Sequence, residues 1–268
     1  MPLIDLKHIS KRFGYLVVLS DISLQVAEGE SVVVIGASGT GKSVLLKHIV
    51  GLLKPDYGEV WFDSKRIDTL PERKLADVRK NFGFLFQMGA LFDSMSVTDN
   101  VAFPLREHTK LSLNEIYTIA EQKLSMVGLP SIGKKMPGEL SGGQKKRVAL
   151  ARAIALNPKV ICYDEPTTGL DPIRSDVINE LILKLQRELR VTSITVTHDM
   201  NSAFKVGNRI VMLHEGKVVF DGTPKEIQAS DNEVVRRFVQ GEASEQELAE
   251  LEQSVSQPTE QDDTTWQV

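Results

Sequence analysis

The order of apolar segments predicts an α/β protein built on a parallel sheet. The runs "SVVVI" (31–35) and "KVICYD" (159–164) are almost wholly apolar, which is typical of strands covered on both faces. An amphipathic segment, "DVINELILKLQRELR" (176–190), has the period of a helix. Strands that alternate with helices favour parallel pairing, because the helix carries the chain back to the same end of the sheet. A third observation in favour of this fold class is the glycine-rich run that directly follows the first of these strands.

Shorter signals predict the other elements in order. We expect strands at "LIDLKHI" and on both sides of the turn "AEGE", and a helix from "GKSVLLKHIVGLL". A hairpin follows at "GEVWFDSKRI" and a short strand at "FGFLFQ". The stretch from about 94 to 136 has helical character, clearest at 113–129. The remaining predictions are a strand at "VTSITVTHD" and a hairpin at "RIVMLHEGKVVFDGTP" that turns at "HEGK".

Composition limits the function classes. The 268 residues carry a formal net charge of −4, which disfavours a nucleic-acid partner because such proteins usually present a basic surface. Cys162 is the one cysteine, so no internal disulfide forms, and we interpret it as a small buried apolar residue. No apolar run reaches the roughly 18 residues that a membrane span needs, and the N-terminus has no signal pattern. We therefore expect a cytosolic chain that depends on another chain for any membrane span.

The glycine-rich run "GASGTGKS" matches the phosphate-binding P-loop and has the required strand before it and helix after it. Glycines let the backbone wrap phosphates closely, and the helix N-terminus favours an anion. Lys42 is expected to reach the β- and γ-phosphates of ATP and Ser43 to bind Mg²⁺. This motif alone leaves kinases, GTPases and helicases open. The ATP-binding residues it predicts are Gly36, Ala37, Ser38, Gly39, Thr40, Gly41, Lys42 and Ser43.

Two acids end the strand "KVICYDEP", at the edge of a parallel sheet where ligands bind. We expect Asp164 to hold Mg²⁺, directly or through water. Glu165 is expected to polarise the water that attacks the γ-phosphate. Without the P-loop, two surface acids after a strand would be an equally good interpretation.

A second glycine motif, "LSGGQKKRVALARAIAL" (140–156), begins another helix. Ser141 can cap this helix at Gly142 and Gly143, and the helix start is a second anion site. One chain thus carries two phosphate-facing motifs about a hundred residues apart.

With "LSGGQ" and "DEPTTGLDP" both present, the chain resembles the ABC transporter ATPase family. The resemblance implies a parallel-sheet core with an antiparallel β subdomain and an α-helical subdomain, the latter inserted at about 88–156 of a nucleotide-binding domain spanning 1–241. In the family each ATP lies between the P-loop of one chain and the signature of another. A homodimer with two such sites is therefore implied, with Ser141, Gly142, Gly143 and Gln144 acting across it.

The resemblance assigns four further residues. Gln87 corresponds to the Q-loop glutamine, near Mg²⁺ and the attacking water, and Asp171 to the D-loop. His198 corresponds to the switch histidine at the γ-phosphate, so that Lys42, Glu165 and His198 form the catalytic set. Phe13 lies where an aromatic ring stacks on adenine, with Tyr15 as the alternative.

The segment "FQMGALFDSMSVTDNVAFPLREHT" (86–109) resembles the ATPases of Mla- and Mce-type lipid transporters. This implies an ATPase at the cytoplasmic face of the inner membrane that powers the movement of phospholipid or a related lipid between that membrane and the outer envelope. The implied partners are a multi-span permease, a periplasmic MCE-domain lipid carrier and, in some systems, a small STAS-domain protein. The permease is expected to dock on this segment, with Phe92 and Arg106 in contact and about half of its apolar residues in the core.

Residues 242–268 contain acids but no Lys or Arg. We interpret them as an acidic extension, partly disordered, in which Leu248 and Leu251 are possible contacts to the second copy.

Three other functions compete with lipid transport. An importer ATPase for another small solute stays open. A soluble ABC ATPase acting on DNA or ribosomes is disfavoured by the short interval between the motifs and by the single cassette. A nucleotide sensor without turnover is disfavoured because Glu165 and His198 are both present.

Overall fold

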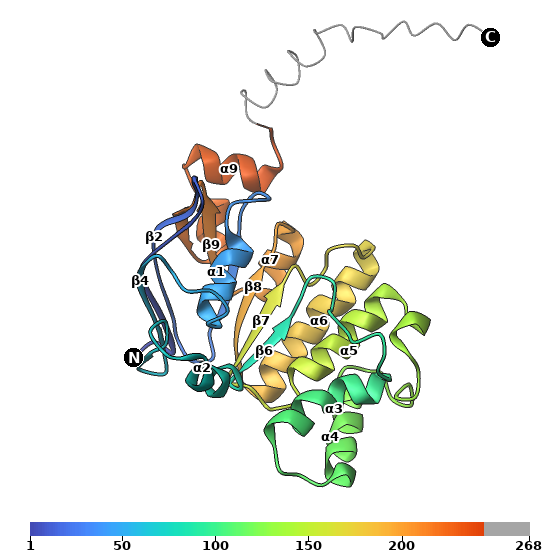
Figure 1. The fold of residues 1–268 in the computed structure, drawn as a ribbon. Coiled ribbons are helices and arrows are strands. Elements are labelled where there is room, and N and C mark those ends of the chain that lie inside the picture. The colour runs from blue at the N-terminus through green and yellow to red at the C-terminus, as the bar shows by residue number, and fades with distance from the viewer. Residues whose placement is uncertain (244–268) are drawn as a thin grey trace, which may run out of the picture.

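A six-stranded sheet forms the centre of the computed structural model, which describes residues 1–243 (Figure 1). The strand order is β10-β9-β3-β8-β7-β6. All neighbours pair in parallel except β9 and β10, which form the predicted hairpin. The parallel core expected from the alternating pattern is confirmed. The strands are β3 (Ser31–Ile35), β6 (Phe82–Leu85), β7 (Val160–Asp164), β8 (Thr192–Val196), β9 (Arg209–His214) and β10 (Lys217–Gly222).

A second, antiparallel sheet has the order β2-β1-β4-β5. The turn from β4 to β5 runs through Asp63 and Ser64, whose φ angles are 49° and 62°. Two successive positive φ angles are typical of the tight hairpin turn in which glycine is favoured. Ser64 takes that position here. The strands are β1 (Ile4–Phe13), β2 (Leu16–Val26), β4 (Tyr57–Phe62) and β5 (Lys65–Arg66).

The central sheet separates two hydrophobic clusters, because successive side chains of a strand point to opposite faces. Val32 and Val34 of β3 belong to the cluster under the antiparallel sheet, whereas Val33 and Ile35 belong to the cluster under the helices. Helix α1 (Lys42–Ile49) packs in the first cluster, and α2 (Glu72–Arg79) follows β5. Cys162 of β7 is fully buried in this cluster, as expected for a small core residue.

Most helices cover the other face, and α3 and α4 lie at the end of the molecule away from β1, β2 and β4 (Figure 1). Side-chain caps start several of them: Ser96, Ser112 and Ser141 each accept a hydrogen bond from a backbone N–H three residues on. The helices are α3 (Val97–His108), α4 (Leu113–Met126), α5 (Gly142–Ala153), α6 (Pro172–Leu189), α7 (Met200–Val206), α8 (Pro224–Gln228), α9 (Glu233–Gln240) and the 3₁₀ turn η1 (Pro137–Glu139).

Two sequence-based expectations about helices differ from the structure. The helical stretch predicted to reach 136 ends at Met126, because Gly128 turns into the left-handed region with φ 71°. The short helices α2, α7, α8 and α9 were not predicted. Within residues 1–243, no helix combines the length and apolarity that crossing a membrane requires. The expected contacts of Leu248 and Leu251 lie outside the described residues.

Candidate functional site

A cleft of about 410 Å³ opens at the carboxyl ends of the parallel strands, where open α/β sheets bind ligands. It brings together residues from six separate segments of the chain. The lining residues are Phe13, Val18, Ser38, Gly39, Gly41, Lys42, Ser43, Val44, Gln87, Glu165 and His198. Val18 and Val44 are the members that sequence reasoning missed, since an apolar residue in a strand or helix gives no local sign of lining a cleft.

The glycine-rich loop forms one wall of this cleft. Gly39 and Gly41 have φ angles of 82° and 94°, which residues other than glycine rarely adopt. A Cβ atom on Gly41 would lie 2.8 Å from the carbonyl oxygen of Val18. The loop therefore passes β2 at a distance that only glycine permits, and its curvature fits a chain of phosphates.

Lys42 begins helix α1, and its ammonium folds back over the loop. Its Nζ donates hydrogen bonds to the carbonyl oxygens of Gly36 and Ala37, both at 2.8 Å. Burial lowers the pKa of Lys42, while the carboxylates of Glu165 and Asp164 oppose that shift. The cation is therefore held at the cleft, where an anion can replace the loop carbonyls as its partner.

Ser43 lines the cleft and bonds to Asp164, which is not itself among the lining residues. The Ser43 Oγ donates to Asp164 Oδ1 at 2.8 Å. Burial raises the pKa of Asp164, with the Ser43 hydrogen bond opposing the shift and the charge of Glu165 adding to it. A hydroxyl and a carboxylate oxygen are ligands that Mg²⁺ accepts. No cluster of three His, Cys, Asp or Glu side chains suited to a metal occurs in residues 1–243, so an ion here also needs phosphate and water oxygens.

Glu165 lies at the centre of a hydrogen-bond network. Its Oε1 is 3.0 Å from His198 Nδ1, and its Oε2 accepts from Thr168 Oγ1 at 3.0 Å. Its backbone N–H donates to Val196 O of β8 at 2.9 Å, and its φ is 50°. The left-handed backbone conformation of a non-glycine residue costs about 1–3 kcal/mol of free energy, so the surroundings must hold Glu165 in it.

Gln87 and Phe13 both line the cleft. Gln87 is exposed and directly follows the strand β6 and Phe86. Phe13 is 48% exposed and lines the cleft, whereas Tyr15 is fully exposed and does not. Arg152 of α5 donates to the carbonyl oxygens of Gly89 and Ala90, both at 2.8 Å, and so fixes the loop that follows Gln87.

The second glycine motif does not reach this cleft within one chain. Ser141 and Gln144 form a capping box, in which the Gln144 N–H donates to Ser141 Oγ and the Ser141 N–H donates to Gln144 Oε1. Asp171 likewise caps α6 by accepting from the Arg174 N–H at 2.9 Å. Neither these residues nor Gly142 and Gly143 line the cleft, and Ser141 and Gly142 are exposed.

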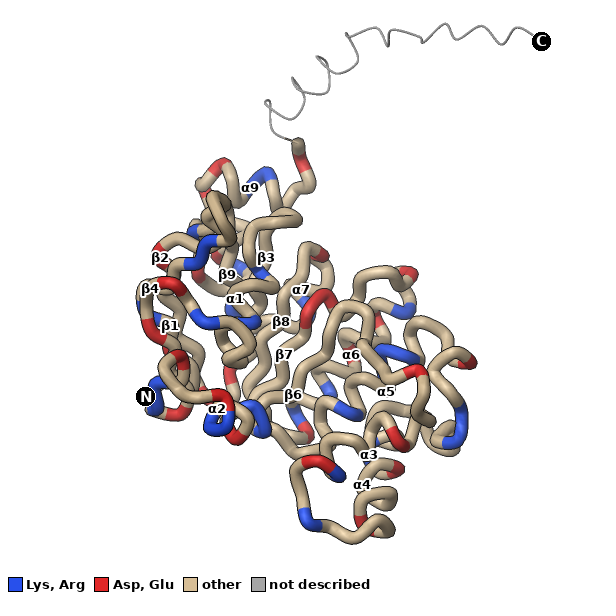
Figure 2. Tube along the Cα trace, in the orientation of Figure 1, with Lys and Arg blue, Asp and Glu red and all other residues tan. Residues whose placement is uncertain are grey.

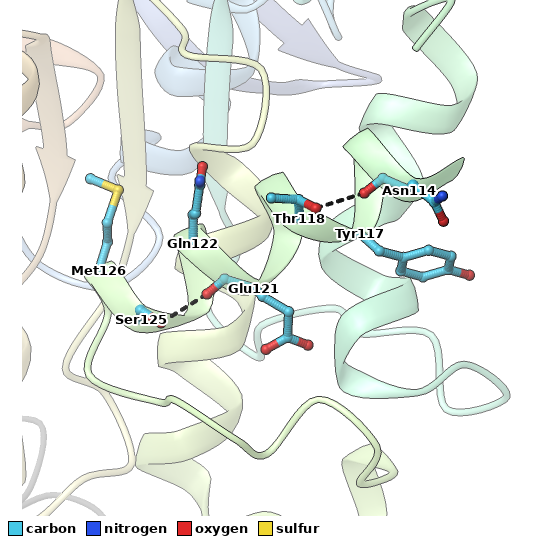
Figure 3. Close-up of a pocket in the computed structure, with 7 residues that line it drawn as sticks. All are labelled: Asn114, Tyr117, Thr118, Glu121, Gln122, Ser125 and Met126. Atoms are coloured by element: carbon cyan, nitrogen blue, oxygen red, sulfur yellow. Dashed lines mark hydrogen bonds between the residues drawn. The ribbon is translucent and has the colours of Figure 1, made fainter. Parts of the chain in front are cut away.

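Another hollow, of about 930 Å³, lies on the outer face of α4 (Figure 3). All its labelled residues come from that one helix. The Thr118 and Ser125 hydroxyls donate to backbone carbonyls of the same helix, at Asn114 and Glu121. No polar groups from different elements converge on it, so it lacks the composition of a catalytic site.

A third hollow, about 460 Å³, lies between β6, α2, α3 and α5, and we call it the aromatic cleft. Phe92 is 40% exposed there, and its ring centroid lies 4.8 Å from that of Phe103. Val101, by contrast, is core. Arg106 is not among the lining residues and instead bonds to Asp99 at 3.3 Å. The lining comprises Phe82, Phe84, Phe86, Phe92, Phe103, Pro104 and Leu156 with glycine and alanine residues, and the basic side chains Arg79, Lys80, His108 and Arg152.

Comparison with known proteins places these features in context. A protein-family model described as ABC transporter matches residues 19–168. The chain is 44% identical over 238 residues to the "probable ribonucleotide transport ATP-binding protein mkl" of Mycobacterium leprae, covering 89% of this chain and 69% of that protein. It is also 44% identical over 241 residues to the intermembrane phospholipid transport system ATP-binding protein MlaF of Haemophilus influenzae, covering 90% of this chain and 91% of that protein.

Solved structures of ABC transporter proteins have a similar fold. The cassette MJ0796, described as a bacterial ABC transporter cassette in dimeric form, superposes with a TM-score of 0.77 at 36% identity, covering 82% of this chain and 98% of that one. The protein cbiO1 of Clostridium perfringens, described as part of an ABC transporter complex, superposes with a TM-score of 0.79 at 31% identity, covering 94% of this chain and 99% of that one.

Proposed function

The chain belongs to the ABC transporter ATP-binding family, and from that premise we propose that it hydrolyses ATP at two sites shared between two copies of itself. The resemblance drawn from "LSGGQ" and "DEPTTGLDP" is thereby confirmed. One observation carries the proposal of shared sites. The P-loop, Glu165 and His198 meet in one cleft, whereas Ser141 and its glycines lie outside that cleft on the same chain. A second copy can supply them.

The residues of the cleft have distinct roles in this proposal. Phe13 stacks on the adenine, and the loop N–H groups with Lys42 bind the phosphates. Ser43, Asp164 and Gln87 would hold Mg²⁺, which when bound draws negative charge off the transferring phosphoryl group. Glu165 accepts the proton of the attacking water, and His198 holds its carboxylate from the other side while facing the γ-phosphate.

The signature residues act on the partner's nucleotide. In α5 the first backbone N–H groups point out of the helix start, where they favour an anion. The side chain of Gln144 is already engaged in the capping box with Ser141. Ser141, Gly142 and Gly143 are therefore the residues that contact phosphate, and Gln144 shapes the helix start for them. Asp171 holds the start of α6 in the same way.

The aromatic cleft is the proposed docking site for a membrane permease. Its rings offer an apolar surface of the kind that interfaces bury, and its basic side chains favour a partner helix that carries acidic residues. Phe84 and Phe86 line it immediately before Gln87 in sequence. A shift of Gln87 on nucleotide binding would therefore change the shape of this cleft. We place the chain accordingly at the cytoplasmic face of the inner membrane.

We propose phospholipid as the transported solute. The match to the phospholipid transport protein MlaF spans 91% of that protein, whereas the equally identical match to the ribonucleotide transport protein spans 69% of its length. Phospholipid transport to the outer envelope needs a lipid carrier outside the membrane. A periplasmic MCE-domain protein, and in some systems a small STAS-domain protein, complete the proposed complex. Over residues 1–243, charges of both signs are interspersed along the chain trace, and no basic stripe of the kind that binds nucleic acid stands out (Figure 2).

Purification of the tagged chain from its own membranes in mild detergent tests this proposal. Mass spectrometry would identify the proteins and lipids that accompany it. We expect a multi-span permease, an MCE-domain protein and bound phospholipid. A permease that accompanies a soluble solute-binding protein in place of the MCE-domain protein would favour the ribonucleotide or small-solute alternative and overturn the lipid assignment.

A further inference from the structure

Lys146 lies in the second turn of α5 and is almost completely buried, with 6% of its surface exposed. Its side chain crosses from this helix to the loop that follows β7. There the Nζ donates hydrogen bonds to three carbonyl oxygens, those of Glu165 at 3.2 Å, Pro166 at 2.7 Å and Thr168 at 2.7 Å. No role is assigned to this residue by the P-loop, the signature or the acidic pair.

Three carbonyl oxygens that point at one spot create a negative potential, and a buried carbonyl without a donor is costly. A protonated lysine has three N–H donors, one for each of these oxygens. Burial lowers the pKa of Lys146 to about 8, and the charge of Glu165 opposes that shift. The ammonium form therefore persists at neutral pH, and the arrangement is built around it.

The loop that Lys146 holds is the loop that presents Glu165 to the cleft. Glu165 has φ 50°, a conformation that needs support from its surroundings. Thr168, whose carbonyl oxygen accepts a hydrogen bond from Lys146, also donates its hydroxyl to Glu165 Oε2 at 3.0 Å. Lys146 thus fixes both the backbone of Glu165 and the position of a residue that orients its carboxylate.

We infer that Lys146 is a positioning residue for ATP hydrolysis, because it fixes the backbone of residues 165–168 and thereby aims the Glu165 carboxylate at the attacking water. The inference rests on the proposed role of Glu165. It predicts a fault in turnover and not in nucleotide binding, since Phe13, the P-loop and Lys42 lie on other walls of the cleft.

Substitution Lys146→Met keeps the length of the side chain but removes all three donors. With the purified full-length chain and MgATP, we expect kcat to fall roughly 10- to 100-fold, the scale of a small displacement of a catalytic group. We expect KM for ATP to stay within about threefold of the unsubstituted value. Lys146→Gln retains two amide donors, so its kcat should lie between those of the Met variant and the unsubstituted chain.

Lys123 provides a matched control. It is equally buried, with 7% exposed, burial likewise lowers its pKa, and its Nζ donates to Asn157 Oδ1 at 2.6 Å, away from the cleft. Lys123→Met should lower the melting temperature as Lys146→Met does and leave kcat unchanged. An equal loss of kcat in both variants would reduce Lys146 to a stabilising role and overturn the inference.

The variant Glu165→Gln distinguishes a failure of the role of Lys146 from a failure of the proposed ATPase site. If it stops turnover while Lys146→Met and Lys146→Gln both retain the full kcat, the positioning role of Lys146 is wrong and the proposed function stands. If Glu165→Gln itself retains full turnover, the proposed function of the site is what fails.

Discussion

Lys42 is a residue whose hydrogen bonds we expect to change when a nucleotide binds. Its ammonium now bonds to two carbonyls of its own loop. Phosphate oxygens are stronger partners for a cation than neutral carbonyls, because the hydrogen bond is then charge-assisted on both sides. The loop carbonyls therefore keep the lysine in place without competing effectively for it.

Lys42→Ala is expected to reduce ATP turnover by at least about 100-fold, on the scale of removing one group that stabilises charge in a transition state. The loop would keep its shape, because glycine conformations and the Thr40 bond to Ala37 maintain it. Steady-state ATPase assays of the purified chain measure this effect. Turnover at the level of the unsubstituted chain would contradict the assignment of the P-loop.

His48 is fully buried in α1, and its Nδ1 lies 2.7 Å from Val44 O, while its Nε2 has no hydrogen-bond partner. Burial lowers its pKa below the usual 6.5, with the Val44 carbonyl opposing that shift and Lys11 adding to it. The unfolded chain therefore binds a proton at a higher pH than the folded chain does. It follows that stability falls as the pH drops below about 6.5.

Substitution His48→Leu removes this titration. We expect its melting temperature to depend less on pH than that of the unsubstituted chain between about pH 6.5 and the lower pKa of the folded state. Thermal unfolding at a series of pH values gives the comparison. Equal slopes for the two chains would show that His48 does not contribute to acid sensitivity.

Residue-level roles were predictable where they depend on contiguous motifs. The P-loop and Glu165 each follow a buried strand and Asp164 ends one, so their location at the sheet edge follows from the sequence alone. Lys146 and Thr168 were missed as partners of Glu165, although both lie inside recognised motifs. Their contacts depend on how closely α5 approaches the loop after β7, which no spacing in the sequence specifies.

Among the elements, β6, α2, α3 and α5 together shape the aromatic cleft. The sequence predicts an interface in residues 86–109, and Phe92 lines the cleft, while its contact with a permease stays a prediction. Arg106 does not line the cleft, because its guanidinium turns to Asp99. The residues of α3 that line the cleft are Phe103, Pro104 and His108.

Phe92→Ala is expected to weaken permease binding by about 2 kcal/mol, or roughly 30-fold in Kd, if Phe92 is a central contact. Leu113 at the start of α4 is a matched control, since it is 61% exposed and lies outside the cleft. Leu113→Ala should leave binding unchanged. The measurement is the amount of each variant that co-purifies with the permease. If the Phe92→Ala chain co-purifies as well as the Leu113→Ala chain, the proposed docking site is wrong.

The strands and hairpins were more predictable than the helices. Apolar runs and tight turns identify strands over five or six residues, whereas α7 and α8 span only 7 and 5 residues. The start of α8 did carry a local signal, since Thr223 and Glu226 form a capping box with proline between them. Such short helices depend on packing for their stability, so their capping residues alone do not reveal them.

For the whole molecule, the division into a domain over 1–241 with a helical insertion at 88–156 stays a prediction. The helices α3 and α4 share one hydrophobic cluster with the central sheet through α5. The fold class itself was predictable, because alternating elements and fully apolar strands leave few arrangements. The relation between the P-loop and the signature of a second copy is the property that one chain alone does not contain.

The most direct test of the shared ATP sites is the mass in solution of the Glu165→Gln chain, measured by light scattering with and without ATP. We predict a monomer without ATP and a dimer with it, since bound ATP is then held and not hydrolysed. Adding Ser141→Arg to the same chain should prevent the dimer while a fluorescent ATP analogue still binds the P-loop. A chain that binds ATP yet stays monomeric, or a dimer that is indifferent to the signature, would contradict the shared site.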